Sequence, residues 1–208
     1  MTTGSWEADR KAYEQAANWF VGVTAQVDDR WERPGLGEWS VRDLVGHTSR
    51  ALLTVESYLD EPATAVRLTS PIEYLAAMAA GAGSPAQVAE RGRQAGTALG
   101  DQPAAAVAEI AERVLARVAR AGPDDLVATP VGGMRLADYL PTRTFELTVH
   151  TCDLAAAVGA DQAVPADAAT VAAAVIGTIA AHRRRAAPLL LAATGRGPLP
   201  DGYSVLPS

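Results

Sequence analysis

A row of polar side chains within an apolar helix is the feature that most constrains how this chain can fold. The apolar spacing from Leu136 to Val158, followed by Gly159, predicts one long helix. Five polar or aromatic residues recur in it at offsets 0, 4, 7, 11 and 14, which places them on one stripe: Tyr139, Arg143, Glu146, His150 and Asp153. Apolar residues flank the stripe on both sides, so we expect it to face the core.

A buried carboxylate and imidazole are costly unless a partner compensates them, and a metal ion is one such partner. Glu146 and His150 lie one helical turn apart, with about 5–6 Å between their Cβ atoms. A third ligand is predicted on another helix, which begins at Ser40 with the acidic form of a capping box, Ser40-Val-Arg-Asp43. His47 lies among the apolar residues of that helix and therefore faces inward. The sequence thus predicts a site made of His47, Glu146 and His150.

Two histidines and one carboxylate are typical of catalytic zinc sites, which keep a fourth position open for water or substrate. The same ligands also suit Fe(II), Ni or Mn, and zinc is the first prediction. A purely structural interpretation stays open for each residue. His47 alone is compatible with a hydrogen-bonded core histidine, and Glu146 with His150 is compatible with a buried ion pair.

Three more polar residues are candidates for a catalytic role. Asp153 is placed to accept a hydrogen bond from a ligating imidazole, or to be a surface carboxylate. Arg143 is suited to bind a substrate carboxylate through its fork of N–H groups, or to form an ion pair with Glu146 or Asp138. Arg50, on the predicted second helix, has the same two interpretations.

The rest of the chain also has helical patterns, so we expect an all-α fold: an antiparallel bundle of four main helices with short accessory helices. Ser70-Pro-Ile-Glu73 and Ser84-Pro-Ala-Gln87 are further helix starts. Pro141 predicts either a kinked first turn or a helix that begins near this proline. The expected helices span residues 5–27, 40–61, 71–80, 85–99, 103–121, 136–158 and 165–187, with a loop at 31–39 and a brief extended stretch at 126–131.

We expect one domain over residues 1–208, with a short C-terminal tail from about 188 to 208. The formal net charge of −6 and the lack of a dense basic face argue against nucleic acid as a partner. The run Arg183-Arg184-Arg185 is interpreted as a solvated helix end, with an anion contact as the alternative.

The single cysteine excludes an intramolecular disulfide, and the N-terminus lacks the pattern of a signal peptide. The most apolar run, residues 171–181, is too short to span a bilayer. We therefore expect a cytoplasmic protein without a membrane partner. The Ala-rich helix faces are compatible with a homodimer.

Two segments together resemble a known family: Gly37-Glu-Trp-Ser-Val-Arg-Asp-Leu-Val-Gly-His47 and Arg143-x2-Glu146-x3-His150-x2-Asp153. The chain is similar to the mycothiol-dependent maleylpyruvate isomerase N-terminal domain, within the DinB/YfiT-like metalloenzyme superfamily. The resemblance runs from the first helix to the last, although residues 61–100 carry no motif of the family.

The resemblance implies an antiparallel four-helix bundle that holds a divalent metal, usually zinc, through His47, Glu146 and His150. It also implies that the metal binds and activates the thiol of mycothiol, a low-molecular-weight thiol. Isomerisation then proceeds by addition, bond rotation and expulsion of the thiol, whereas a transferase keeps the new C–S bond. Maleylpyruvate isomerase carries a second, C-terminal domain, for which residues 188–208 are too few, so we expect another electrophile.

Three functions follow as hypotheses. The first is a metal- and thiol-dependent transferase or isomerase acting on a small electrophile. The second is a metal-dependent hydrolase in which bound water attacks. The third is a non-catalytic metal-binding module with a role in stress response.

Overall fold

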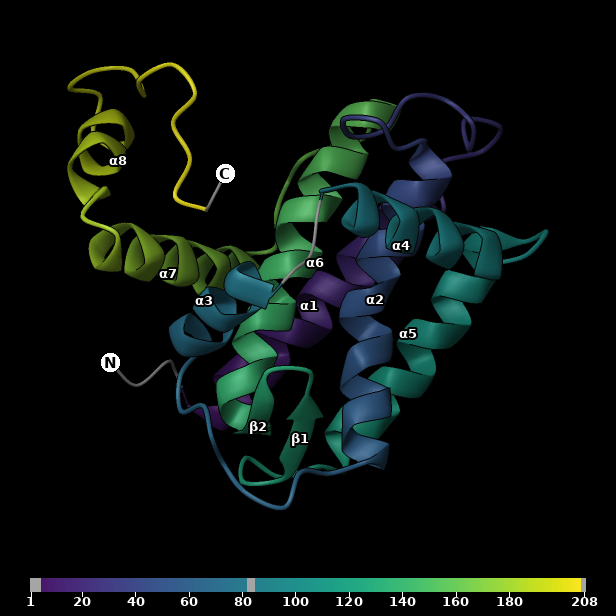
Figure 1. Ribbon diagram of the computed structural model, residues 1–208. Coiled ribbons are helices and arrows are strands. Elements are labelled where there is room, and N and C mark those ends of the chain that lie inside the picture. The colour runs from purple at the N-terminus through teal and green to yellow at the C-terminus, as the bar shows by residue number, and fades with distance from the viewer. Residues whose placement is uncertain (1–4, 82–84, 207–208) are drawn as a thin grey trace.

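The computed structural model describes residues 5–81 and 85–206, which form a mostly helical fold with one small sheet (Figure 1). A helix lies in each of the predicted helical ranges, although the last range is divided between two helices, and the all-α expectation is wrong in one respect, because a two-stranded hairpin precedes α6. The elements are α1 (Trp6–Thr24), α2 (Val41–Asp60), α3 (Pro71–Gly81), α4 (Pro85–Ala98), α5 (Pro103–Ala119), β1 (Leu126–Thr129), β2 (Gly132–Arg135), α6 (Leu136–Val158), α7 (Ala166–His182) and α8 (Ala186–Ala193).

The core lies where α1, α2, α5 and α6 meet, since α1 and α2 each contact both α5 and α6. Large apolar side chains from these helices are fully buried there: Phe20, Leu44, Leu52, Val114, Leu147 and Leu154. Burying each side chain of this size stabilises the fold by about 1.5–3 kcal/mol. This packing holds the inner faces of α2 and α6 against each other, and those faces carry the predicted ligands.

The helix-start signals in the sequence form real caps. Ser40 Oγ accepts a hydrogen bond from the Asp43 amide at 3.2 Å, and the Asp43 carboxylate accepts one from the Ser40 amide at 3.0 Å. Ser70 caps α3 by accepting from the Glu73 amide at 3.2 Å. The predicted start at Ser84 lies outside the described residues.

Helix α6 begins at Leu136 and continues through Pro141, so the alternative start near the proline is wrong. The first amides of α6, which have no partner within the helix, donate to carbonyls of the preceding loop: Leu136 to Asp125 at 2.7 Å and Ala137 to Pro123 at 3.1 Å. These contacts anchor the first turn ahead of Pro141. At the other end, Gly159 has φ 67°, which confirms the predicted left-handed stop.

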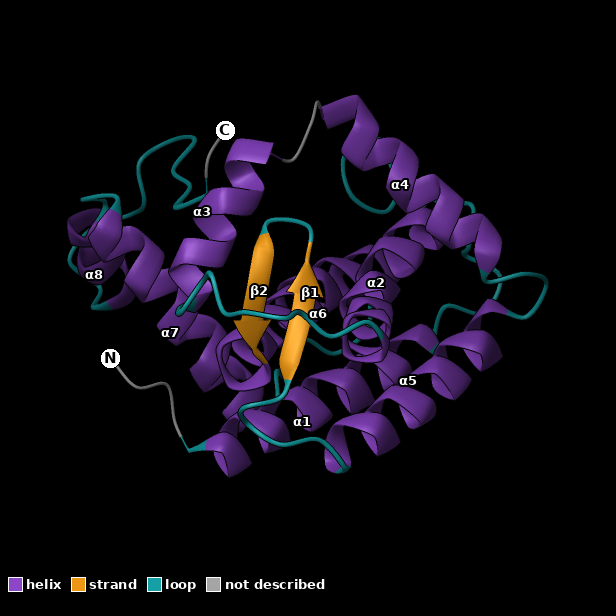
Figure 2. Cartoon of the chain, turned by 60° about the horizontal axis from the view of Figure 1, so that its bottom comes forward, coloured by secondary structure: helices purple, strands orange, loops and turns teal. Residues whose placement is uncertain are grey.

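The stretch predicted to be briefly extended forms a hairpin with the residues that follow it. Strand β1 pairs antiparallel with β2, with Leu126 opposite Arg135 and Thr129 opposite Gly132. The loop between α2 and α3 crosses the hairpin (Figure 2), and its Arg67 amide donates to the Gly133 carbonyl at 2.8 Å. A Cβ at Gly133 would lie 2.2 Å from the Ala65 carbonyl oxygen, so this crossing requires glycine.

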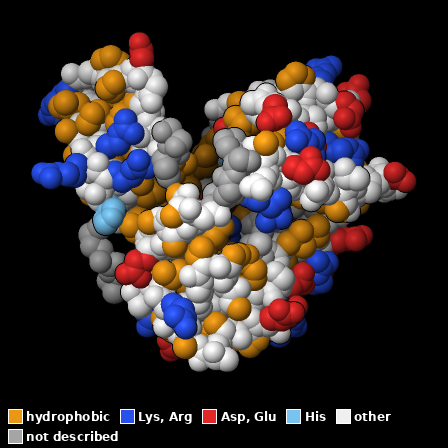
Figure 3. All heavy atoms as spheres, viewed as in Figure 1, with side chains coloured by type: hydrophobic (Ala, Val, Ile, Leu, Met, Phe, Trp, Pro, Cys, Tyr) orange, Lys and Arg blue, Asp and Glu red, His pale blue; other side chains and the backbone are white. Residues whose placement is uncertain are grey.

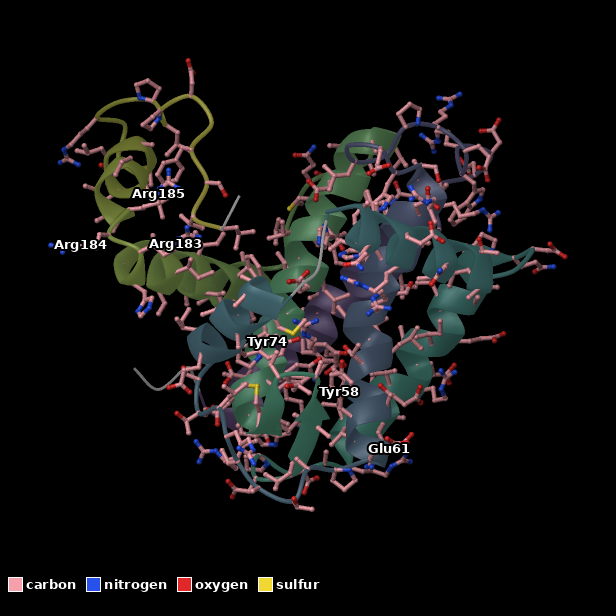
Figure 4. All side chains as sticks on the ribbon, in the orientation of Figure 1. Tyr58, Glu61, Tyr74, Arg183, Arg184 and Arg185 are labelled. Carbon is pink, nitrogen blue, oxygen red and sulfur yellow. The ribbon has the colours of Figure 1, made fainter. Side chains whose placement is uncertain are left out.

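The predicted helix at residues 165–187 is interrupted. Helix α7 ends at His182, Arg184 turns the chain with φ 57°, and α8 starts at Ala186. Pro188 lies in the first turn of α8, where its missing N–H removes no helical hydrogen bond. The arginine run is exposed and lies in this arm, away from α2 (Figure 4), and two of its members contact the tail: Arg183 donates to the Val205 carbonyl at 3.3 Å, and Arg185 lies over the Tyr203 ring. None of the helices in the described part of the chain is long and apolar enough to cross a membrane.

Candidate metal centre

The packing of α2 against α6 brings the three predicted ligands together. His47 comes from the first half of α2, whereas Glu146 and His150 come from successive turns of α6. One ligand atom from each of the three side chains lies within 4.8 Å of the others, and no second group of this kind occurs among the described residues. The fold therefore brings His47 next to two residues that lie about a hundred positions further along the sequence.

The α6 residues form a chain of polar contacts around His150. Its Nε2 lies 3.3 Å from Glu146 Oε2, and its Nδ1 lies 3.2 Å from Asp153 Oδ2. The side chains of Glu146, His150 and Asp153 are 26%, 18% and 31% exposed, so the histidine in the middle of this chain of contacts is its most buried member. Asp153 accepts from Nδ1–H, and Nε2, which lies against Glu146, exposes a lone pair to the cluster only once it has lost its own proton.

His47 lies between two other rings. Its ring centroid is 4.5 Å from that of Trp39 and 4.9 Å from that of His150, and the two imidazoles are perpendicular. Trp39 is itself held by a 3.0 Å hydrogen bond from its indole N–H to the Ala89 carbonyl on α4. The buried Nδ1 of His47 has no hydrogen-bond partner among the described residues. A core histidine would normally be satisfied by a neighbour, so this orphaned nitrogen fits a cation site better than a structural one.

The three side chains perturb one another's protonation. Burial would raise the pKa of Glu146, but the hydrogen bond with His150 and the positive charge of Arg143 lower it to about 2. Burial lowers the pKa of His47 to about 4, and the neighbouring His150 adds to this shift. For His150, burial lowers the pKa, but the hydrogen bonds with Asp153 and Glu146 outweigh it and raise the pKa to about 9. Glu146 is thus an anion and His47 a neutral base at pH 7, the forms that bind metals.

A cavity of about 460 Å³ opens beside the cluster. Its walls combine aromatic and apolar side chains with three arginines and one carboxylate: Arg50, Arg91, Arg143 and Glu146, with Tyr58, Tyr74, Leu75 and Met78 among the others. Figure 4 shows that Tyr58 projects from α2 and Tyr74 from α3. The cationic excess and the apolar walls suit a small anionic or electron-poor molecule.

Arg143 is stacked between aromatic rings. Its Cζ lies 5.3 Å from the ring centroid of Tyr74 and 5.1 Å from that of Tyr139, and its Nε donates to Thr142 Oγ1 at 3.0 Å. Only 9% of the residue is exposed. Within the described chain Arg143 makes no ion pair with a carboxylate, so the alternative of an ion pair is not observed. Its fork of N–H groups is held rigidly at the cavity wall.

Arg50 lines the same cavity, and its guanidinium has no carboxylate partner among residues 5–81 and 85–206. Asp153 hydrogen-bonds to His150 as described above. Tyr74 and Arg91 are among the lining residues that were not predicted as site residues, because residues 61–100 carry no motif of the family. The serine and proline that start α3 indicate a helix there but not which side chain faces the site.

Fold and site together define a mostly helical domain with a His/Glu/His cluster between two packed helices. The family model of the mycothiol maleylpyruvate isomerase N-terminal domain matches residues 12–155, a range that holds all three cluster residues. The chain therefore belongs to this family, which confirms the resemblance seen in the sequence. No curated protein and no solved structure matches the chain in the other two comparisons.

Proposed function

We propose that this protein is a divalent-metal-dependent enzyme that uses mycothiol to transfer sulfur to, or isomerise, a small electrophile. Family membership supports mycothiol as the thiol. The observation that carries the metal is the convergence of His47, Glu146 and His150, together with a buried His47 Nδ1 that has no hydrogen-bond partner among the described residues. Zinc is the first choice, because two histidines and a carboxylate in a partly buried site are its common catalytic ligands.

In this proposal His47, Glu146 and His150 hold the ion, and Asp153 fixes the tautomer and orientation of His150 through the 3.2 Å contact at Nδ1. A divalent cation bound there would supply the chemistry of thiol activation, because it would lower the pKa of a bound thiol toward neutral pH. The cluster lies at the wall of the cavity, which aromatic and apolar side chains also line.

Arg50 and Arg143 are proposed to bind the electrophile. A guanidinium binds a carboxylate through two parallel hydrogen bonds, which fixes the orientation of the bound molecule. The two stacked tyrosines hold Arg143 in one position, and Arg50 reaches the same cavity from α2. An electrophile with at least one carboxylate therefore fits best.

The arrangement of the helices as a bundle and the single-domain organisation are also proposals. We propose that α1, α2, α5 and α6 constitute the antiparallel four-helix bundle of DinB-like proteins, with the rest of the chain as part of the same domain. Hydrolysis by bound water is less well supported, because the one carboxylate next to the ligands, Asp153, is engaged by His150.

Metal analysis tests the proposal first. Protein purified without added metal is expected to contain about one ion per chain, and His47→Ala is expected to lose it. His182→Ala is a matched control, because His182 is exposed at the end of α7. Metal retained in full by His47→Ala would contradict the site.

An assay with mycothiol and a panel of electrophiles then tests the activity, following both thiol consumption, expected of a transferase, and conversion of the electrophile, expected of an isomerase that releases the thiol again. We expect one of the two to require both metal and thiol, and to be lost in His47→Ala but kept in His182→Ala. The absence of both with every electrophile would contradict the proposal. Turnover that continues without thiol would instead identify a hydrolase.

A further inference from the structure

The two imidazoles of the metal centre are held in different ways. Asp153 accepts a hydrogen bond from the Nδ1–H of His150, which sets the orientation of that ring. The ring of His47 makes no hydrogen bond within the described part of the chain, and its buried Nδ1 has no partner there. The terminal torsion of a histidine side chain is only weakly restricted, so another contact must fix the orientation of His47.

The indole of Trp39 makes such a contact. Its ring centroid lies 4.5 Å from that of His47, and the two ring planes are tilted by 34°. The ring of His150 meets His47 at 90°, with the centroids 4.9 Å apart. Aromatic rings at these separations favour offset and edge-to-face arrangements, so a rotation of the His47 ring away from this position loses favourable contacts.

Trp39 is itself fixed in both its backbone and its ring. Its amide donates to the Leu36 carbonyl at 2.9 Å, and its carbonyl accepts from the Gly35 amide at 2.8 Å. The indole N–H donates to the Ala89 carbonyl of α4 at 3.0 Å, and only 9% of the residue is exposed. The indole is therefore a rigid surface against which the His47 ring rests.

Helix α4 packs on α2 and holds this indole in place (Figure 1). A Cβ at Gly92 of α4 would lie 2.7 Å from Trp39 Cε2 and 2.8 Å from its Nε1, so α4 lies this close to the indole only because residue 92 is glycine. Figure 3 shows basic and acidic side chains interspersed on the outer surface over α4. The helix thus presents small residues to Trp39 and charged residues to solvent.

We propose that Trp39 is a positioning residue for His47: α4 fixes the indole, and the indole fixes the imidazole. The inference rests on the proposed function, because His47 is there a metal ligand. An indole N–H is a donor only, so Trp39 supplies no ligand of its own. Its stacking does for His47 what the hydrogen bond from Asp153 does for His150. The affinity for metal therefore depends on α4, a helix that contributes no ligand.

Substitution of Trp39 tests the proposal. Trp39→Leu removes both the stacking and the indole N–H, whereas Trp39→Phe keeps an aromatic ring and loses only the N–H. Trp19→Leu is the matched control, because it makes the same substitution at a partly buried tryptophan of α1 outside the cluster. Competition with a chelator at pH 8 would measure the affinity for zinc. In metal-free protein, the nuclear Overhauser effect (NOE) between the rings of His47 and His150 would report their relative orientation, and thermal melts would verify folding.

We expect Trp39→Leu to bind zinc about 10- to 100-fold more weakly and to lose the NOE, as on removal of other groups that orient a ligand. Trp39→Phe should recover most of the affinity and keep the NOE, and the control should match the wild type in both. Either a wild-type affinity or a wild-type NOE in folded Trp39→Leu would overturn the inference.

A second variant covers the case in which Trp39→Leu does not fold. Gly92→Ala displaces the indole from α4 and should weaken zinc binding severalfold; unchanged affinity would then overturn the inference. Absence of zinc binding by the wild type would count against the proposed function instead, and the NOE in metal-free protein would still decide whether Trp39 orients His47.

Discussion

The affinity for metal is expected to depend on one proton. The pKa of Glu146 is about 2 and that of His47 about 4, so neither group titrates between pH 5 and pH 8. The pKa of His150 is about 9, so this ring is protonated over that range and must lose its proton before it can bind an ion. Affinity should therefore rise about tenfold per pH unit from pH 5 to pH 8 and level off near pH 9.

The free-energy cost of removing this proton can be compared with the free energy of metal binding. The pKa of His150 is about 9, so pH 7 lies about two units below it. Removing the proton at pH 7 therefore costs about 2.7 kcal/mol, and this cost reduces the free energy of metal binding. Structural zinc sites bind with apparent free energies of about 10–16 kcal/mol near this pH. Competition by the proton therefore weakens binding about a hundredfold without abolishing it.

Two measurements check this reasoning. Competition with a chelator of known pH dependence, from pH 5.5 to 8, should give a slope of about +1 in log affinity against pH. Calorimetry at pH 7 in two buffers of different ionisation enthalpy should count about one proton released per ion. His182→Ala should behave as the wild type. A slope near zero, or near two, would refute the assignment of one titrating ligand.

Further predictions concern the support of the site. Asp153→Ala removes the acceptor that orients His150 and should weaken metal binding about 10- to 100-fold at pH 8 in the chelator assay; unchanged affinity would contradict this role. Gly46→Ala places a Cβ 2.1 Å from the Gly96 amide nitrogen on α4, and should lower the free energy of unfolding in urea by about 1–3 kcal/mol, despite the better helix propensity of alanine. Equal stability would mean that the helices separate there at little cost. Ser40→Ala should cost about 1 kcal/mol in the same assay, and no loss would show that the cap is dispensable.

Local signals in the sequence predicted many of the elements. The capping box at Ser40 and the left-handed stop at Gly159 can each be predicted from the sequence. Each one depends only on residues within about four positions of itself along the chain. The hairpin and the break after His182 were not predicted correctly. The crossing loop that packs on Gly133 is remote in sequence from the hairpin, and at the break Arg184 has φ 57° while the Arg185 carbonyl accepts a hydrogen bond from Tyr203 of the tail.

Part of the candidate site, like part of the fold, could be predicted from the sequence. Helical periodicity placed Glu146, His150 and Asp153 on one face, because a period of 3.6 residues is a local property. The orphaned nitrogen of His47 and the stacking of Arg143 between two tyrosines could not be predicted. Both depend on which side chains from other helices fill the neighbouring space.

By itself, the order of residues determined which side chains face inward on each helix and where many of those helices begin and end. Only the tertiary structure decided that α2 lies beside α6 with its imidazole in reach of the α6 carboxylate, and that α4 holds the indole of Trp39 next to them. The physical reason is the distance along the chain over which each interaction acts. Caps and periodicity act over one or two turns, whereas the meeting of residues a hundred positions apart depends on the packing of the whole core.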